Sequence, residues 1–263
     1  VKQSTSGNNR EWEIKLDYTK KFSEATRLEA GWQSTIEDRF GPSSAYDLLL
    51  NKPVHTFFNE FDYSEQIHGG YVTFGSRIKN LSLQGGLRGE YFWRHPVNMQ
   101  KDENGVIQTV DYQPKGDMQW FPSVFISYSL PEKNELQLNL TRRVDRPRGR
   151  QINPFRDFTD STNISYGNLN LEPEYTMAYE FNYLKNWDNH SLSSTIYHRS
   201  TDDVIQRVSF INDQQTMEST YMNVTRSQST GMEFVLKNNL FKILNLTTSL
   251  NFYYNTLEAS TYT

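Results

Sequence analysis

The sequence contains no cysteine among its 263 residues. This absence excludes disulfide frameworks, thiolate nucleophiles and zinc–thiolate sites together. The sequence also lacks an apolar run of roughly 18 residues, and no apolar stretch near its beginning indicates a signal peptide. A protein that crosses a membrane with helices is therefore excluded. Membrane-spanning strands remain possible, because they give a much weaker hydropathy signal.

An excess of one charge is also missing. The chain has 27 Lys and Arg against 31 Asp and Glu, so its formal net charge is -4, and the charges are spread along its length. Proteins that bind nucleic acid normally carry a basic face. We therefore expect no nucleic-acid partner.

Aliphatic residues are scarce as well. Hydrophobic residues make up 36% of the chain, which is low for a globular domain, yet aromatic residues reach 14%. A disordered chain would be poor in both classes. We expect an ordered chain that is not built around a conventional aliphatic core.

Polar and apolar residues alternate throughout the chain. In the segment 11–18, Trp12, Ile14, Leu16 and Tyr18 fall on one face, and charged residues occupy the positions between them. A period of two is the signature of a β-strand. The same pattern recurs in pairs of long segments and predicts about ten strands, which are longer than usual for globular sheets.

The links between these segments alternate in length. Short links are expected near 20–23, 78–80, 131–134, 187–190 and 238–242, and longer excursions near 38–55, 96–116, 148–173 and 208–217. This arrangement predicts an all-β fold, an antiparallel up-and-down meander. Proline is expected in links or at strand ends, where no ladder hydrogen bond is lost: Pro42, Pro53, Pro96, Pro114, Pro131, Pro147, Pro154 and Pro173, with Pro122 near the start of a strand.

Long strands without a dense aliphatic core favour a transmembrane barrel over a soluble sandwich. A sandwich uses short strands and buries one face of each sheet against the other. A transmembrane barrel turns its apolar face to lipid and its polar face to a lumen, and it joins long strands by short turns at one end and longer loops at the other. The sequence therefore predicts a partial transmembrane β-barrel.

Aromatic residues near the strand ends are consistent with two interfacial girdles. Tyr18, Phe22, Tyr128, Tyr183, Trp187 and Phe241 lie near the short links, and Phe57, Phe58, Phe61, Tyr91, Phe92, Trp93, Trp120, Phe121, Tyr253 and Tyr254 lie nearer the long ones. The alternative is that aromatic residues simply favour strands. We favour the girdles, because the strand middles hold Leu, Gly, Ser and Asn instead.

One stretch carries a family resemblance. The segment "TRRVDRPRGRQINPFRDFTDSTNISYGNLNLEPEYTMAYEFNY", followed by "YHRSTDDVIQRV" and "YMNVTRSQSTGMEF", resembles the barrel of TonB-dependent outer-membrane receptors, in their outer-membrane β-barrel branch. That family carries a "GNPxLKPE" segment, which corresponds here to Gly167, Asn168, Leu171, Pro173 and Glu174. Leu169 and Glu172 replace the usual Pro and Lys. We expect the motif to have a structural role.

The resemblance implies both architecture and function. The family barrel has about 22 strands around a plug, so residues 1–263 are expected to form part of one barrel domain, with the plug and the C-terminal strands missing. The implied protein lies in the outer membrane of a Gram-negative bacterium and imports a small nutrient with energy that TonB delivers through the plug. Its implied partners are outer-membrane lipid, the rest of its own barrel and plug, and the TonB complex. The type of nutrient stays open among iron chelates, glycans, peptides and cobalamin-like compounds.

Two long links are the first place to expect ligand-binding residues, at 96–116 and 148–173. The candidate residues, in these links and at the adjoining strand ends, are Tyr112, Arg146, Arg150, Asn153, Phe155, Arg156 and Tyr166. The arginine-rich run "TRRVDRPRGR" could form a patch for anions or nucleic acid. We favour the alternative that its guanidinium groups meet carboxylates across the lumen or lipid phosphates outside.

No residue pattern predicts an enzyme, a metal site or a cofactor. Asp202 and Asp203 are adjacent, and adjacent strand residues point to opposite faces, so this pair cannot flank one glycosidic bond without a bulge. The histidines show no metal-ligand spacing. A secreted all-β adhesion or glycan-binding module is the main alternative to the receptor, and a β-rich hydrolase is a third.

Overall fold

The computed structural model describes residues 2–157, 162–213, 215–240 and 243–258. Within these residues, 13 strands form one sheet, and the single helix, α1, has four residues. The strands are β1 (Lys2–Thr5), β2 (Asn8–Lys21), β3 (Thr26–Asp47), β4 (Lys52–Ile78), β5 (Leu81–Lys101), β6 (Ile107–Asp111), β7 (Lys115–Leu130), β8 (Asn134–Asp145), β9 (Asn163–Ser165), β10 (Glu174–Asn186), β11 (His190–Ile211), β12 (Met217–Leu240) and β13 (Leu244–Glu258), and α1 is Gly149–Ile152. No helix in the described part of the chain is long and apolar enough to span a membrane.

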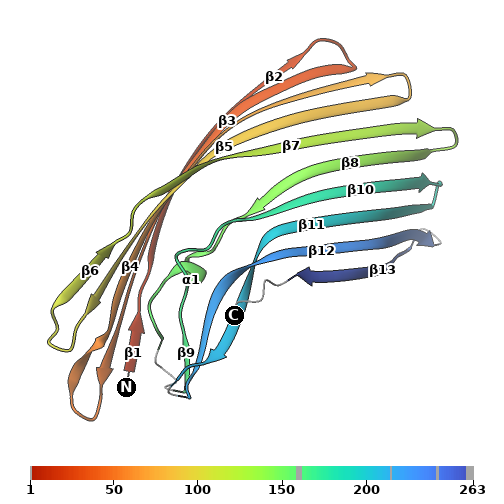
Figure 1. Ribbon diagram of the computed structural model, residues 1–263. Helices are drawn as coiled ribbons and strands as arrows, with labels where there is room; N and C mark the ends of the chain where they lie inside the picture. The colour runs from red at the N-terminus through yellow and green to blue at the C-terminus, as the bar shows by residue number, and fades with distance from the viewer. Residues whose placement is uncertain (1, 158–161, 214, 241–242, 259–263) are drawn as a thin grey trace.

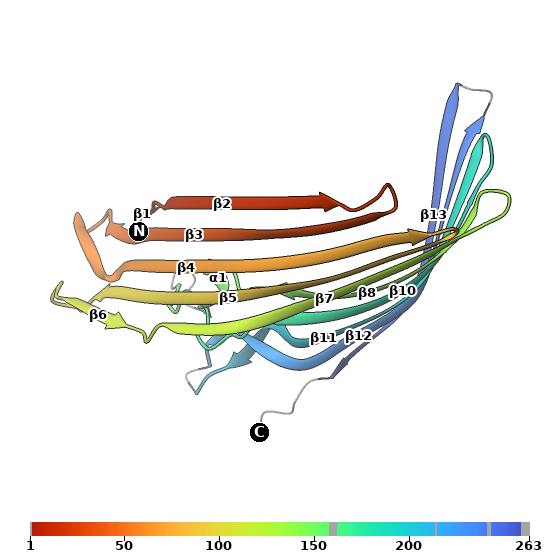
Figure 2. The ribbon, with the colours of Figure 1, turned by 90° about the horizontal axis from the view of Figure 1, so that it is seen from above.

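The sheet is an antiparallel meander, as predicted from the alternation. The long strands follow one another in sequence order, and each pairs with the next. The short strands β1, β6 and β9 are additions, and β9 pairs with β12 in the parallel direction. The sheet curves strongly but stays open, and α1 and β9 lie inside its curve (Figures 1 and 2). The prediction of an all-β partial barrel is confirmed.

Two of the predicted long loops are in fact mostly strand. The segment predicted as a loop at 38–55 is the end of β3 and the start of β4, joined by a turn at 48–51. The segment predicted as a loop at 96–116 contains the end of β5, which continues to Lys101, and the whole of β6. These extensions pair with each other, which satisfies their backbone hydrogen bonds beyond the apolar band. The alternation of polar and apolar residues therefore does not mark where these strands end.

The prediction for proline was wrong at three positions. Pro42, Pro96 and Pro122 lie inside β3, β5 and β7. The register of β3 against β4 shifts between Ser43 and Ala45, directly after Pro42, and bulges are where sheets tolerate proline. Pro96 still contributes its carbonyl oxygen, which accepts a hydrogen bond from the Tyr112 amide at 3.2 Å.

The two faces of the sheet differ in chemistry. Leu138 pairs with Ile126 on one side and Phe181 on the other, and paired residues share a face. Ile126 pairs in turn with Leu83 of β5, so Arg94, at an even-numbered position of β5, lies on the face opposite to Leu138. Arg94 donates to the Leu171 carbonyl of the segment that lies inside the curve (Figure 1), so the face of Leu138 is the convex one. Exposed large apolar side chains on the convex face include Trp12, Ile14, Leu16, Trp32, Val72, Phe74, Leu83, Leu87, Trp120, Leu138, Phe181, Leu250 and Phe252.

The aromatic residues divide between the faces. Tyr18, Tyr128 and Trp187 are exposed near the short turns. Phe61 and Phe92, however, are buried inside the curve at 7% and 4% exposure, so their assignment to a girdle was wrong. Alternation alone does not distinguish a ring that faces lipid from one that packs against a segment folded into the lumen. Phe241 lies outside the described residues.

Candidate functional site

The link between β8 and β10, described at 146–157 and 162–173, includes α1 and β9 and folds into the curve of the sheet (Figure 1). We call it the inward segment. Its two limbs meet at Gly167, whose amide donates to the Asn153 carbonyl at 2.7 Å, while the Asn168 amide donates to the Gln151 carbonyl at 2.7 Å. A Cβ at Gly167 would lie 2.6 Å from both carbonyl oxygens. The close backbone approach therefore requires glycine at this position.

Leu171 anchors this inward segment. Its side chain is fully buried, in a cluster with Phe61, Tyr63 and Ile152. The Arg94 guanidinium, on β5, donates to the Leu171 carbonyl at 2.9 Å. The segment is thereby fixed to the strands β4 and β5.

The same segment is also fixed to the opposite side of the curve. Asn168 donates to the Tyr221 carbonyl at 2.9 Å, and Asn223 exchanges two hydrogen bonds of 2.9 Å with the backbone of Glu172. The Glu174 carboxylate accepts from the Ile205 amide at 2.7 Å. The residues of the "GNLNLEPE" motif thus connect β4 and β5 with β11 and β12.

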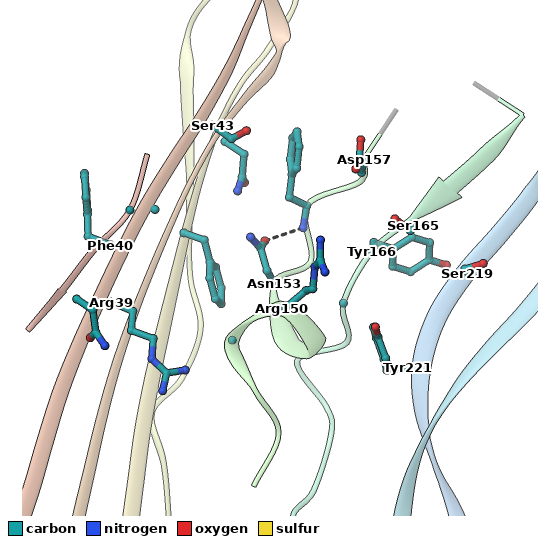
Figure 3. A pocket seen from close by; sticks show the side chains of 18 of the residues that line it. Arg39, Phe40, Ser43, Arg150, Asn153, Asp157, Ser165, Tyr166, Ser219 and Tyr221 are labelled. Carbon is teal, nitrogen blue, oxygen red and sulfur yellow. Dashed lines mark hydrogen bonds between the residues drawn. The ribbon is translucent and has the colours of Figure 1, made fainter. Parts of the chain in front are cut away.

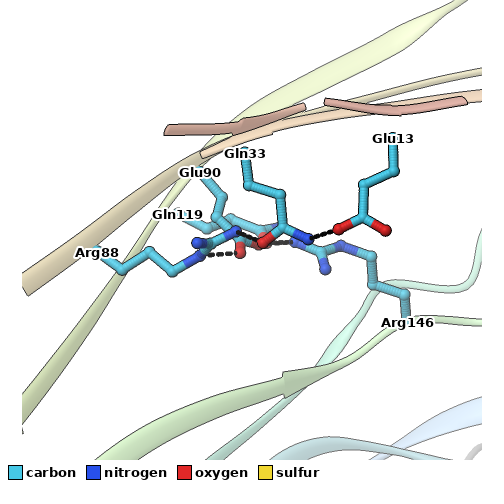
Figure 4. Close-up of polar contacts among 6 residues, drawn as sticks. All are labelled: Glu13, Gln33, Arg88, Glu90, Gln119 and Arg146. Atoms are coloured by element: carbon cyan, nitrogen blue, oxygen red, sulfur yellow. Dashed lines mark hydrogen bonds and ion pairs between the residues drawn. The ribbon is translucent and has the colours of Figure 1, made fainter. Parts of the chain in front are cut away.

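A polar network crosses the concave face (Figure 4). Its members are Glu13, Gln33, Arg88, Glu90, Gln119 and Arg146. Arg146 donates to Glu90 at 2.6 Å and to Gln119 at 2.8 Å, and its guanidinium lies 4.8 Å from the ring centroid of Phe92. At Arg146 these contacts fit the interpretation that the guanidinium groups of the arginine-rich run meet carboxylates, whereas Arg150 of the same run makes no ion pair with a described residue.

The inward segment forms one wall of a pocket of about 680 Å³ (Figure 3). Four of the residues predicted from the sequence line it: Arg150, Asn153, Phe155 and Tyr166. Sequence reasoning missed the lining residues that come from distant strands: Arg39, Phe40, Ser43, Asn59, Phe61, Arg207, Ser219 and Tyr221. No local signal marks these positions, because their proximity depends on the curvature of the sheet.

The other predicted site residues lie elsewhere. Tyr112 follows β6 and does not line this pocket. Arg146 lines a smaller pocket of about 250 Å³, which Arg150 also reaches. Arg156 forms an ion pair with Glu218 and lies 4.9 Å from the ring centroid of Tyr166. The structure therefore brings four of the seven predicted residues around one pocket, and Tyr112, Arg146 and Arg156 do not line it.

The comparison with known families agrees with this architecture. The whole chain, residues 1–263, matches the model of the outer membrane protein beta-barrel family. The chain belongs to this family. No curated protein sequence matches the chain.

Solved structures share the fold of this family member at low sequence identity. The copper transporter OprC is 15% identical with a TM-score of 0.76, and 97% of this chain covers 39% of OprC. The ferric yersiniabactin uptake receptor FyuA from Yersinia pestis is 11% identical with a TM-score of 0.69, and 97% of this chain covers 37% of it. The hemophore receptor HasR from Serratia marcescens is 13% identical with a TM-score of 0.65, and 97% of this chain covers 42% of it. The chain thus spans about two fifths of the length of these proteins.

In this barrel-family chain, Glu218 of β12 holds the part of the inward segment that includes Arg156 and Tyr166. It accepts hydrogen bonds from Asn212 at 2.9 Å and Tyr166 at 3.0 Å, and it pairs with Arg156. The hydrogen bond from Asn212, with those from Tyr166 and Arg156, holds the pKa of Glu218 below its ordinary value of 4.5. Because folding lowers the pKa of Glu218, the contacts of its carboxylate stabilise the fold fully above pH 4.5. This stabilisation is lost as the pH falls through the lowered pKa.

We expect acid to release this contact. The protection of the Tyr166 amide, which donates to the Ser219 carbonyl at 3.1 Å, should stay constant down to about pH 4.5 and fall below it. The Glu218→Gln variant should show the lower protection already at pH 7, because it cannot carry the charge that pairs with Arg156. Hydrogen exchange corrected for intrinsic rates measures both effects. Wild-type protection in the variant at pH 7 would show that the charge of Glu218 does not hold the segment.

Proposed function

We propose that this chain forms part of the barrel wall of a TonB-dependent outer-membrane receptor of a Gram-negative bacterium, which binds and imports a small nutrient. The observation that carries the proposal is the sheet with two unlike faces: an apolar convex face and a polar concave face that holds a pocket of about 680 Å³. Lipid would cover the first face and the nutrient would meet the second. Outer-membrane lipid, the remaining barrel and plug, and the TonB complex acting through the plug are the partners.

The related structures support import as a class of function but leave the cargo open. Their titles name a copper transporter, a ferric yersiniabactin uptake receptor and a hemophore receptor. These three kinds of cargo occur on one fold, and function follows the site rather than the fold. A specific nutrient therefore has to be argued from the pocket of this chain.

The proposal predicts energy-dependent depletion of a solute. Cells with the intact gene and cells without it are incubated in the same defined medium, and the medium is compared by mass spectrometry. At least one solute should disappear only when the gene is present, and a protonophore should stop its depletion. If no solute depends on the gene, and the protein is a stable monomer in buffer without detergent, the secreted adhesion or glycan-binding module is the better description.

A further inference from the structure

The charge of the pocket is opposite to that of the chain. The formal net charge of the chain is -4. Three arginines, Arg39, Arg150 and Arg207, and one acidic residue, Asp157, line the pocket. A concave, partly desolvated wall of one sign concentrates ligands of the opposite sign.

Two of these arginines are available to a ligand. Arg39 is held by Glu37, through two hydrogen bonds of 2.6 Å. Arg150 and Arg207, in contrast, make no ion pair or side-chain hydrogen bond with any residue in the described ranges. Arg150 belongs to the inward segment and is labelled in Figure 3, and Arg207 belongs to β11, so the two arginines approach the pocket from separate elements. Guanidinium groups are well suited to bind carboxylate or phosphate through paired hydrogen bonds.

A buried amide gives independent evidence for a ligand in this pocket. Asn59 lines the pocket and is 1% exposed, and its Oδ1 has no hydrogen-bond partner among the described residues. A buried polar atom without a partner is costly, so native proteins normally satisfy it. A donor group on a bound molecule would satisfy Asn59.

Aromatic side chains supply the remaining surface. Phe61, Phe155, Tyr166 and Tyr221 line the pocket together with the arginines, and Tyr166 and Tyr221 are labelled in Figure 3. Aromatic walls bind flat apolar bodies, whereas a few polar groups set the orientation of the ligand. An inorganic anion alone would leave these aromatic faces unused.

We infer that the pocket binds an organic anion that carries carboxylate or phosphate groups on a ring-shaped body. Arg150 and Arg207 would hold the anionic groups, Asn59 would accept a hydrogen bond from the ligand, and the aromatic side chains would contact the ring. This inference rests on the proposed function, since it treats the pocket as the site of the imported nutrient. It excludes neutral and cationic compounds as the preferred cargo.

Two probes of the same shape test the inference. Benzene-1,3,5-tricarboxylate is an anion with a flat ring, and 1,3,5-benzenetrimethanol is its neutral counterpart. Binding of each to the full-length protein in detergent is measured by calorimetry at low and high salt. We expect the anion to bind at least about tenfold more tightly at low salt, with the difference shrinking at high salt as the charges are screened.

A double variant and a matched control locate the effect. Arg150→Gln combined with Arg207→Gln should weaken binding of the anion about tenfold, with little effect on the neutral probe. Arg143→Gln combined with Lys237→Gln removes the same charge at positions that do not line the pocket, and it should leave binding unchanged. Equal or undetectable binding of both probes, or an equal loss in both double variants, would overturn the inference. Selective binding of the anion by a protein that depletes no solute would contradict import but not the anion site.

Discussion

Leu138→Arg should lower the free energy of unfolding in a lipid bilayer by about 2 to 4 kcal/mol. Leu138 lies near the middle of β8 on the convex face, where it is paired with Ile126 and Phe181 and is 50% exposed. A guanidinium at this position would be placed in the hydrocarbon part of the membrane, where its desolvation is not compensated. Urea titration of the full-length protein in lipid vesicles measures the change, and heat-modifiable gel mobility reports the folded fraction.

The neighbouring residue provides the control. Asn139 faces the concave side, where it lines a second pocket with Gln137, and its cross-strand partner on β10 is Glu180. Arg at position 139 would enter a polar environment beside a carboxylate, so Asn139→Arg should cost much less than Leu138→Arg. If the two variants fold equally well, or Asn139→Arg is the worse one, the convex face does not meet lipid.

Leu171→Ala should weaken the docking of the inward segment by about 2 to 5 kcal/mol. Leu171 is fully buried among Phe61, Tyr63 and Ile152, so the truncation leaves a cavity that close-packed neighbours fill only in part. The loss should be local, because the sheet keeps its own backbone ladder. Hydrogen exchange should therefore rise for amides of the segment, such as that of Asn168, and stay unchanged in the strands.

A truncation on the other face separates docking from general stability. Leu138→Ala removes a similar side chain that lipid can replace, so it should leave exchange of the Asn168 amide unchanged. The Leu171 variant should also lose binding of benzene-1,3,5-tricarboxylate, since the segment carries Arg150 into the pocket. Unchanged exchange and unchanged binding in the Leu171 variant would show that Leu171 does not fix the segment.

The strand pattern could be predicted because it is a local property. Side chains on a strand alternate between its faces, so Trp12, Ile14 and Leu16 identify one strand without reference to any other. Short turns fix which strands are neighbours. Loops were predicted less well: Pro42 and Pro96 lie inside strands that pair beyond the apolar band, where the pattern of hydropathy no longer reports pairing.

The candidate site could be predicted only in part. Arg150, Asn153, Phe155 and Tyr166 belong to one continuous segment, which its motif made recognisable, and all four line the pocket. Arg146 belongs to the same segment but is held by Glu90, a partner 56 positions away in the sequence. Such pairing depends on sequence-distant contacts, so the sequence did not reveal which arginines are free to bind a ligand.

By itself, the sequence determined the strands, their order and the two chemically different faces, because each follows from residues close together along the chain. Tertiary structure alone decided the site. Curvature brings β3 and β4 opposite β11 and β12, and the inward segment, held by Gly167 and Leu171, bridges the space between them. Arg39, Asn59, Arg207 and Tyr221 are far apart in the sequence and line one pocket for that reason. Their proximity comes from packing across the lumen, which no local period of the sequence encodes.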